Sequence, residues 1–436
     1  MDCLEELAQR SMIQVTKRRY DDSASYCRIH DLFRDMCISE AKENRFLEIY
    51  KNDSANCGTN ANAARRLMIC HEIETLNYSN SKLRGLFYYN EYIYNTLAFK
   101  PVNEQFGGFK LLRVLYLNSL DMSEFPSGIK SLIHLRYLEL HVDDLKEVPS
   151  WIAHLCNLQT FVVRCRMFIG KIPDSLWTIE SLRHVDLSIS SSVPPPNMGN
   201  IELKNLETLK WVPAGEWIGK MLPKFTNLRK LNITNISADH ADTLSSSLQK
   251  FVQLASLTIQ GDEIPSDNII TAFSNQHCLK KLYIWGEFNC KQLPRNDVFP
   301  QQLVKLILIN SQLEQDPMAT LEKLEFLKYL SLGNQSYRGK QMICSAAGFP
   351  QLFSLTIVGF YALEEWKIEE KAMPCLKYLH IAYCSELKVL PEGLRNVPLD
   401  QLVLRSMSEE LETRVKENTG EDWSKIQHVH DFSVRP

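Results

Sequence analysis

The pattern L-x-x-L-x-L recurs thirteen times along the chain, and this repetition restricts the possible folds more than any other feature of the sequence. The first clear copy reads LRVLYL from Leu112, and the next reads LRYLEL from Leu135. Successive copies start 22 to 26 residues apart. A unit of that length cannot bury its own apolar side chains, so neighbouring units have to stack into one continuous core. The other copies start at Leu158, Leu182, Leu206, Leu228, Leu254, Leu279, Leu303, Leu327, Leu352, Leu376 and Leu399.

The last L-x-L of each copy predicts a short strand. Side chains of a strand alternate between two faces, so the leucines point into the core and the residues between them point away from it. Proline follows four of these strands, at Pro126, Pro149, Pro173 and Pro391, where its fixed φ favours a bend. The spacing lies in the range of leucine-rich repeats. The predicted fold class is therefore α/β, a curved leucine-rich-repeat solenoid with a parallel sheet on its concave face.

The composition supports a folded protein and argues against several functional classes. Hydrophobic residues make up 44% of the 436 residues, charged residues make up 23%, and the net charge is −3. So small a net charge predicts binding neither to nucleic acid nor to a membrane surface. No apolar run approaches the roughly 18 residues that span a bilayer, and the acidic N-terminus MDCLEELAQRS has no apolar signal core. The 12 cysteines form no CxxC pair, which favours reduced thiols over a disulfide framework or a zinc site.

The chain divides into four predicted segments. Residues 1–50 read as a helix, a strand–turn–strand hairpin and a second helix, a unit too small for a well-buried core of its own. Residues 51–64 are small and polar, as in a flexible linker. The solenoid occupies residues 65–405, and residues 406–436 read as a C-terminal cap that covers the last repeat.

Two of these segments carry more detailed expectations. Two weaker copies of the repeat, near Leu67 and Leu83, precede the thirteen clear ones. In the cap, we expect a helix that stops near Gly420 and then a strand-like segment that contains Trp423.

The stretch CRIHDLFRDMCISEAKEN places a His-Asp pair directly before a predicted helix. Asp31 is expected to be the N-cap of this helix, because its carboxylate can accept from the free N–H groups of the first turn. His30 is not needed to form the helix. From these residues alone, the pair is an ordinary helix start.

The chain resembles the C-terminal part of the plant intracellular nucleotide-binding, leucine-rich-repeat (NB-ARC-LRR) disease resistance proteins. The stretch LEELAQRSMIQVTKRR resembles the end of their winged-helix (ARC2-like) subdomain, so the solenoid would follow a partial winged-helix segment. Ile29-His30-Asp31 resembles their Met-His-Asp motif, with isoleucine in place of methionine. The resemblance implies that His30 senses the phosphates of bound ADP and that Asp31 helps to hold the inactive arrangement.

The resemblance also implies a function. In such an innate immune receptor, the repeat domain recognises a pathogen effector or a guarded host protein. It also restrains an intramolecular nucleotide-binding domain that ADP and ATP switch. No G-x-x-x-x-G-K-[ST] loop occurs in this sequence, so ADP or ATP is expected only in a complete receptor, and this chain alone is expected to hold no cofactor. The expected location is the cytoplasm, with the nucleus or a membrane-associated complex as further options.

Other functions fit the sequence less well. No catalytic residues or metal ligands have a supporting context, so an enzyme is not expected. The alternative is a leucine-rich-repeat adaptor or substrate-recognition subunit without nucleotide switching. Whether the chain is a piece of a longer protein or a short protein in its own right stays open, as do its oligomeric state and the identity of the pathogen molecule.

A candidate partner-binding patch follows from the alternation along two neighbouring repeats, LKKLYIWG and LVKLILIN. The residues between the buried positions are large and apolar there, and two lysines lie beside them. An exposed apolar patch with a polar rim usually marks an interaction site. A register slip in LVKLILIN would bury these side chains instead, because a continuous apolar run does not fix which residues face in. The candidate residues are Tyr283, Trp285, Ile307, Ile309 and Tyr329.

Overall fold

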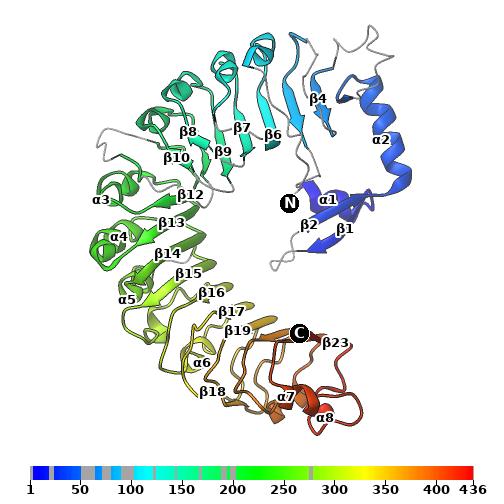
Figure 1. The fold of residues 1–436 in the computed structure, drawn as a ribbon, viewed down its shortest axis with the longest axis vertical. Coiled ribbons are helices and arrows are strands. Elements are labelled where there is room, and N and C mark those ends of the chain that lie inside the picture. The colour runs from blue at the N-terminus through cyan, green and yellow to red at the C-terminus, as the bar shows by residue number, and fades with distance from the viewer. Residues whose placement is uncertain are drawn as a thin grey trace. The chain divides into compact units, whose positions relative to one another are not determined.

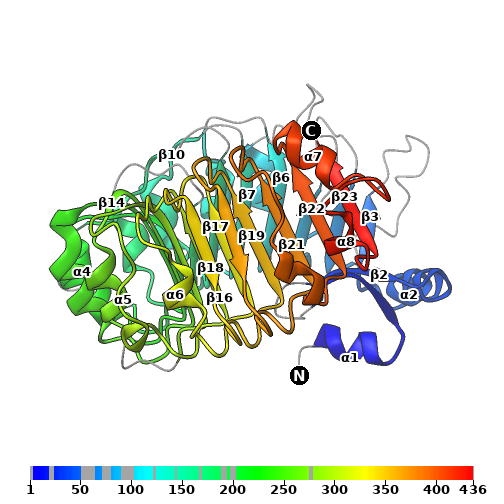
Figure 2. The ribbon, with the colours of Figure 1, turned by 90° about the horizontal axis from the view of Figure 1, so that it is seen from below.

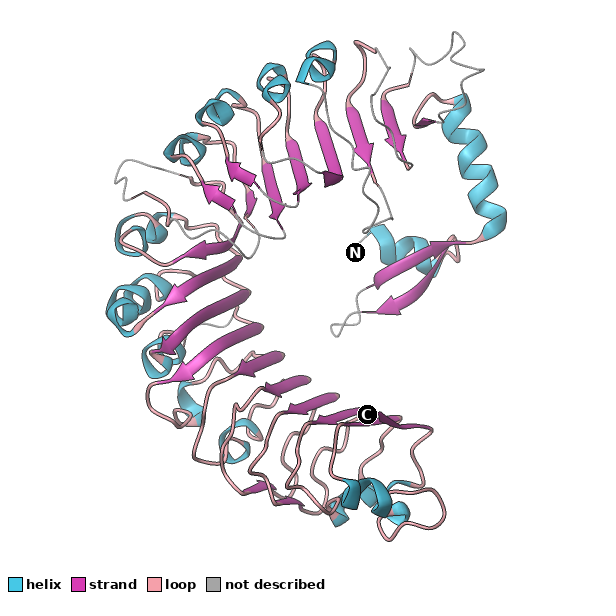
Figure 3. Ribbon diagram, viewed as in Figure 1, coloured by secondary structure: helices cyan, strands magenta, loops and turns pink. Residues whose placement is uncertain are grey.

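The computed structural model describes residues 3–18, 24–50, 64–70, 80–89, 103–120, 124–142, 145–165, 169–187, 194–196, 203–273 and 278–435. They belong to two compact units, Met1–Ser190 (unit 1) and Ser191–Pro436 (unit 2). In each unit, parallel strands form the main sheet and short helices lie along one side of it (Figures 1 and 3). None of the helices in the described ranges is both long and apolar enough to cross a membrane.

Unit 1 begins with the predicted helix–hairpin–helix order. Helix α1 (Cys3–Gln9) precedes the antiparallel hairpin of β1 (Ile13–Arg18) and β2 (Ala24–Ile29), and helix α2 (Asp31–Glu43) follows. The turn expected inside the hairpin falls on residues outside the described ranges, as does most of the predicted linker.

The expectation that Asp31 is the N-cap of α2 is wrong by one residue. The carbonyl oxygen of His30 accepts the first helical hydrogen bond, from the backbone N of Arg34 at 2.9 Å. His30 therefore occupies the flanking position and Asp31 is the first helical residue. The Asp31 carboxylate lies beside two guanidinium groups, 3.7 Å from Arg28 and 3.6 Å from Arg34.

Several apolar side chains of this N-terminal segment are exposed to solvent. On α2, Met36 is 54% exposed and Ile38 is 39% exposed. On β2, Tyr26 and Ile29 are exposed as well. Scattered exposed apolar residues are ordinary, and these four do not share one face, because Met36 and Ile38 lie two residues apart on a helix and Tyr26 and Ile29 lie three apart on a strand.

The main sheet of unit 1 has the strand order β3-β4-β5-β6-β7-β9-β11, and each described pair within it is parallel. Strand β3 lies inside the segment that the sequence reading assigned to residues 1–50, yet it pairs with β4 as part of the repeat sheet. The strands are β3 (Glu48–Tyr50), β4 (Arg66–Ile69), β5 (Gly85–Tyr88), β6 (Val114–Leu120), β7 (Tyr137–Val142), β9 (Thr160–Cys165) and β11 (His184–Asp186).

On the other side of the unit 1 repeats, the chain returns through short helical turns. Three of the predicted proline bends, at Pro126, Pro149 and Pro173, directly precede such turns, as expected from the fixed φ of proline. Two short strands pair here in a separate parallel sheet. These elements are η1 (Asn103–Gly108), η2 (Ser127–Ser131), β8 (Leu145–Glu147), η3 (Ser150–His154), β10 (Ile169–Lys171) and η4 (Asp174–Thr178).

The main sheet of unit 2 has the strand order β12-β13-β14-β15-β16-β17-β19-β21-β22-β23, again with parallel pairs (Figure 2). The strands are β12 (Thr208–Pro213), β13 (Lys230–Ile236), β14 (Ser256–Ile264), β15 (Lys281–Phe288), β16 (Lys305–Ile309), β17 (Tyr329–Gly333), β19 (Ser354–Val358), β21 (Tyr378–Ala382), β22 (Gln401–Arg405) and β23 (Asp431–Arg435).

Short helices cover the buried side of the unit 2 sheet, where leucine and isoleucine side chains pack between helix and strand. A small parallel pair, β18 with β20, lies among the returning segments. These elements are α3 (Trp217–Lys220), η5 (Leu222–Lys224), η6 (Ala238–His240), α4 (Ala241–Leu248), α5 (Ser266–Thr271), η7 (Asn296–Val298), α6 (Met318–Leu321), β18 (Gln341–Cys344), β20 (Glu365–Ile368) and η8 (Glu392–Asn396).

The thirteen predicted copies of the repeat are confirmed. Each copy contains a strand of a main sheet, and the leucine that opens each copy is at most 2% exposed. The two weaker copies near Leu67 and Leu83 also form strands, β4 and β5. Burial of one leucine side chain stabilises a fold by about 1.5–3 kcal/mol relative to leaving it exposed. The stacked leucines are therefore the main source of stability in both units.

The C-terminal end differs in detail from the prediction. The first helix, α7 (Glu409–Arg414), ends before Gly420, and Trp423 begins a short helix, α8 (Trp423–Ile426), rather than a strand. A strand follows later, as β23, and it pairs with β22. At this helical turn, buried Asp422 binds Lys425 three residues on, a contact that the periodicity of the sequence could not indicate.

Candidate partner-binding face

The side of the unit 2 main sheet that faces away from the helices is its open face. Side chains on this face lie in rows, because neighbouring parallel strands pair without a shift over most of their length. In β16 and β19, the alternate residues are half-buried and the residues between them are buried, which is the predicted pattern.

The predicted apolar patch lies on this open face. Tyr283 pairs with Ile307, and Trp285 pairs with Ile309, as the repeat spacing predicts. Trp285 is 47% exposed, and Ile307 and Ile309 are half-buried rather than core residues. The register slip that would have buried the two isoleucines does not occur. Their role in binding a partner stays a prediction.

Two features give the patch a fixed form. Gly286, next to Trp285, has a φ of +143°, and a Cβ there would lie 2.0 Å from the carbonyl oxygen of Gly261 on the neighbouring strand. Only glycine fits at that point, so the backbone that carries Trp285 is closely held. On the other side, the Lys305 ammonium lies 5.4 Å from the centre of the Tyr283 ring, within range of a cation–π contact.

Aromatic side chains continue from the patch towards the C-terminus. Tyr329 pairs with Lys305 along the first row, and its ring centre lies 5.9 Å from that of Phe353. The Phe353 ring in turn lies 5.1 Å from that of Tyr378, which is 41% exposed. Edge-to-face contacts at such distances hold the three rings in an ordered strip. The strip was not predicted, because Phe353 lies just before its strand.

The open face of unit 1 carries a different kind of cluster, also absent from the sequence prediction. Glu139, at the centre of β7, is only 8% exposed although its position points away from the core. Its carboxylate accepts a hydrogen bond from the Tyr137 hydroxyl, contacts His141 Nε2 at 2.7 Å, and accepts from Arg164 Nε at 3.2 Å. The alternating Tyr, Glu and His in YLELHV signal such a cluster, but Arg164 comes from the next repeat.

This arrangement keeps Glu139 charged. Burial raises the pKa of the Glu139 carboxyl, but hydrogen bonds from His141, Tyr137 and Arg164 outweigh it and lower the pKa to about 2. Burial and the bond to Glu139 raise the pKa of the Tyr137 hydroxyl. The side chains of the cluster thus satisfy one another, so the cluster fastens β7 to β9 before any partner arrives.

The predicted nucleotide-sensing pair lies in unit 1, at the start of α2. The side chains of His30 and Asp31 are both exposed. An imidazole at a helix N-terminus can donate to a phosphate oxygen, and the role that the resemblance implies for His30 stays a prediction. Two exposed side chains can contact a phosphate from one side but cannot enclose a nucleotide, so other residues have to complete any such site.

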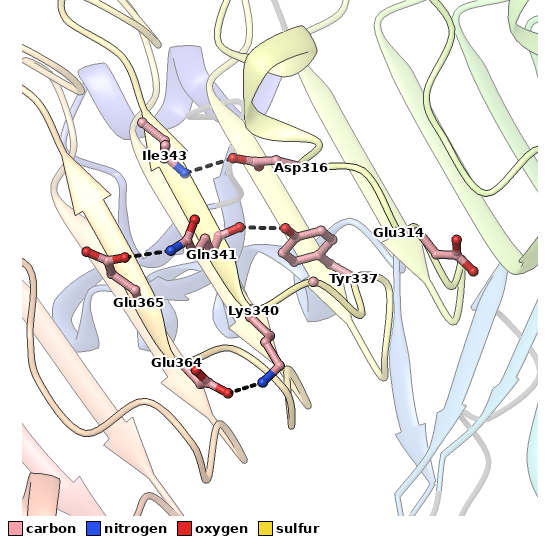
Figure 4. Close-up of a pocket in the computed structure, with 9 residues that line it drawn as sticks. Glu314, Asp316, Tyr337, Lys340, Gln341, Ile343, Glu364 and Glu365 are labelled. Carbon is pink, nitrogen blue, oxygen red and sulfur yellow. Dashed lines mark hydrogen bonds and ion pairs between the residues drawn. The ribbon is translucent and has the colours of Figure 1, made fainter.

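A pocket of about 620 Å³ opens beside β18 and β20 in unit 2 (Figure 4). Its polar side chains mostly engage one another: Lys340 Nζ lies 2.6 Å from a Glu364 carboxylate oxygen, and Gln341 donates to Glu365 at 3.0 Å. Asp316 accepts from the backbone N of Ile343 at 2.8 Å. These contacts join adjacent repeats, so the pocket reads as part of the scaffold. No group of three or more potential metal-ligating side chains gathers anywhere in the described ranges.

The stacked parallel strands, the buried leucines and the open face define a leucine-rich-repeat protein. Residues 96–430 match the family described as "Leucine-rich repeat region". A solved leucine-rich-repeat protein of Leptospira interrogans, LIC12759, shares the fold, with a TM-score of 0.56, 19% identity, and coverage of 88% of this chain and 99% of that chain.

Curated relatives narrow the class. The disease resistance protein RPP8 of Arabidopsis thaliana is 31% identical over 98% of this chain and 48% of its own length. The At1g59780 protein of the same plant, also named for disease resistance, is 33% identical over 98% of this chain and 46% of its own length. This chain belongs to the leucine-rich-repeat disease resistance proteins of plants, and it spans about half the length of these relatives.

Proposed function

We propose that this chain is the recognition and autoinhibitory part of an intracellular innate immune receptor. The open face of unit 2 binds a pathogen effector or a guarded host protein. Within the complete receptor, the chain also restrains a nucleotide-binding domain that ADP and ATP switch. It acts in the cytoplasm by binding other proteins and carries out no catalysis itself.

The observation that carries the recognition role is the exposed, ordered patch on strands β15 and β16. Trp285 is 47% exposed, and its paired neighbour Ile309 continues the apolar surface onto the next strand. Trp and Tyr are frequent energetic anchors of protein interfaces, and a protein in water gains nothing by displaying them without a partner.

The exposed apolar residues of β2 and α2 support the autoinhibitory role. Tyr26 and Ile29 on β2 and Met36 and Ile38 on α2 leave apolar side chains exposed on the two elements that flank His30 and Asp31. A nucleotide-binding domain that packs there would bring its phosphate site close to His30. The sensor residues and the residues that contact the nucleotide-binding domain would then lie on the same short segment. Exchange of ADP for ATP would therefore change the contact between the domains.

A two-hybrid screen against secreted pathogen proteins and host proteins tests the recognition role. We expect at least one interactor that Trp285→Ala removes, because truncation of a buried anchor costs about 2 kcal/mol or more. Tyr361→Ala is the matched control, since Tyr361 is an exposed aromatic residue in a turn outside the sheet. Interactors that are all insensitive to Trp285→Ala would contradict the proposal.

Two further measurements test the switch. Calorimetry of this chain alone should show no saturable ADP or ATP binding at micromolar concentrations. In the complete receptor, Asp31→Val should favour signalling without a pathogen, because it removes a charge beside the sensor histidine. Reduced protein abundance without cell-death signalling would make Asp31 a purely structural residue.

A further inference from the structure

The N-terminal edge of the unit 2 open face is strongly basic from β13 to β21, between Glu207 on one side and Asp400, which pairs with Lys377 at 3.2 Å, on the other. Two adjacent rows of residues run along this edge from β13 to β21, and hydrogen bonds between neighbouring backbones fix their order. Half of the positions in these rows are basic and none is acidic, although the whole chain has 52 acidic and 49 basic residues. The basic residues of the two rows, called here the lysine edge, are Arg229, Lys230, Lys280, Lys281, Lys305, Lys328 and Lys377.

The lysine edge borders the apolar patch directly. Lys281 and Tyr283 are successive residues of the open face on β15, and the Lys305 ammonium lies over the Tyr283 ring at 5.4 Å. A protein segment that covers Tyr283 and Trp285 therefore comes within reach of the lysine edge as well. One partner has to be compatible with both surfaces.

The opposite edge of the same strands is acidic. Glu263 on β14 pairs with Glu287 on β15, and Asp262 precedes them on the bulged stretch. Along β15 the open face thus changes from basic at Lys281, through apolar at Tyr283 and Trp285, to acidic at Glu287. Such an arrangement orients a bound partner, because a partner rotated by half a turn would place like charges together.

We propose that the partner of this face is a protein segment that presents apolar side chains flanked on one side by a row of carboxylates. This inference rests on the proposed recognition function and specifies its partner class. The apolar side chains cover Tyr283, Trp285 and their neighbours on β16, while the carboxylates lie along the lysine edge. The lysines of this edge contribute more to association rate and orientation than to final affinity.

A nucleic acid is the other polyanion that a basic edge could attract. The apolar patch and the acidic opposite edge both argue against it, because a phosphate backbone that contacts seven basic groups gains little from isoleucine and meets repulsion at Glu263 and Glu287. Binding of an oligonucleotide therefore serves as one outcome of the test.

The test uses fluorescent probes and the full chain. The first probe is a peptide of about ten residues with alternating Leu and Glu, long enough when extended to cross five strands spaced about 4.8 Å apart. The second replaces every Glu with Lys, the third replaces every Leu with Ser, and the fourth is an oligonucleotide of the same charge as the first. We expect saturable binding of the first peptide alone, weakening as salt concentration rises.

Charge reversal then locates the binding site. Lys281→Glu, Lys305→Glu and Lys328→Glu together should weaken binding of the Leu-Glu peptide by about tenfold or more. The control reverses three exposed lysines outside the strands of the sheet: Lys220→Glu, Lys250→Glu and Lys323→Glu. Trp285→Ala should weaken binding independently of salt.

Failure of the Leu-Glu peptide to bind, or equal binding of any other probe, would overturn the inference. So would equal effects of the two triple reversals. The proposed recognition function would survive these results if Trp285→Ala still removed a two-hybrid interactor. Loss of every Trp285-dependent interactor would instead remove the function on which the inference rests.

Discussion

The open faces of the two units share one strand geometry but carry different kinds of side chain. In unit 1, the outward positions around Glu139 hold polar groups that bind one another, so a carboxylate is only 8% exposed. In unit 2, the corresponding positions hold Tyr283, Trp285 and Ile307, which leave apolar surface in contact with water. The polar groups of the first face bind one another, whereas the second face leaves apolar side chains exposed, and under the proposed function a partner covers them. The same repeat backbone can therefore carry either an internal polar network or an exposed apolar patch.

Measurements of the free energy of unfolding distinguish residues of internal polar networks from residues of the proposed recognition surface. The largest loss is expected at the C-terminal end of unit 2. Asp422 is 1% exposed and its carboxylate binds the backbone N of Leu390 at 2.9 Å, Arg414 at 3.0 Å and Lys425 at 3.0 Å. Asp422→Ala removes the shared acceptor of three groups and leaves buried Lys425 with Glu392, at 2.9 Å, as its remaining carboxylate. We expect a loss of about 3–5 kcal/mol in the free energy of unfolding.

Denaturant unfolding measures this loss. Asp400→Ala is the control, because Asp400 is exposed and its pair with Lys377 at 3.2 Å lies in solvent. That variant should change stability by about 0–1 kcal/mol. Similar losses for the two variants would show that the buried polar network contributes no more to the free energy of unfolding than an exposed ion pair does.

The unit 1 cluster should give a smaller loss. Glu139→Ala removes the acceptor shared by Tyr137, His141 and Arg164, and we expect a cost of about 2–3 kcal/mol. The cost is lower than at Asp422 because the Arg164 side chain is half exposed and can turn to water. Hydrogen exchange at the β7 and β9 amides would report the loss. Glu287→Ala, at an exposed pair with Lys291, should leave exchange nearly unchanged.

Acid should weaken the unit 1 network in a defined range. The pKa of Glu139 is about 2 in the folded chain against an ordinary 4.5, so the charged network stabilises the fold fully above pH 4.5. That stability is lost as the pH falls from 4.5 towards 2. Glu139→Gln should remove this part of the pH dependence at β7 and β9.

Hydrogen exchange has to resolve the two units separately, because the pKa of Asp422 in unit 2 is also lowered and its stabilisation is also lost in acid. Burial raises the pKa of Asp422, but hydrogen bonds from Arg414, Leu390 and Lys425 lower it overall. A pH dependence at β7 that survives Glu139→Gln would assign the acid sensitivity of unit 1 to other groups.

The smallest effect is expected in the apolar patch. Ile307→Thr keeps a β-branched side chain at a half-buried outward position, so the free energy of unfolding should change by about 0.5 kcal/mol or less. Leu306→Ala, one residue away but 0% exposed, is the control and should cost about 2–5 kcal/mol. A large loss for Ile307→Thr would mean that the patch serves the fold and not a partner.

The sequence alone predicts those features of the fold that repeat. Each L-x-L indicates a strand, and the spacing of copies predicts which outward residues become neighbours, as for Trp285 and Ile309. Strands β3 and β23 escape this reading because EIY and DFSVR lack the leucine pattern, although each needs only one paired neighbour to form. The helical turn at Trp423 contains a buried ion pair, which no periodicity records.

The candidate sites show the same division. The patch was predictable because large apolar residues at outward positions are unusual whatever surrounds them. The Glu139 cluster was not predictable from the sequence. Its burial depends on the rotamers of Tyr137, His141 and Arg164, and the spacing of the repeats does not determine rotamers. The binding role of the patch, like that of His30 and Asp31, stays a prediction.

The alternation of buried and half-buried residues along β16 and β19 has a consequence for how such a chain can change over generations. Substitutions at the buried positions disturb packing, whereas those at the alternate positions alter only what the surface offers. The same strands can thus acquire a new specificity one residue at a time while every intermediate still folds. The two-residue period of the strand therefore separates the positions that hold the fold from the positions that can vary.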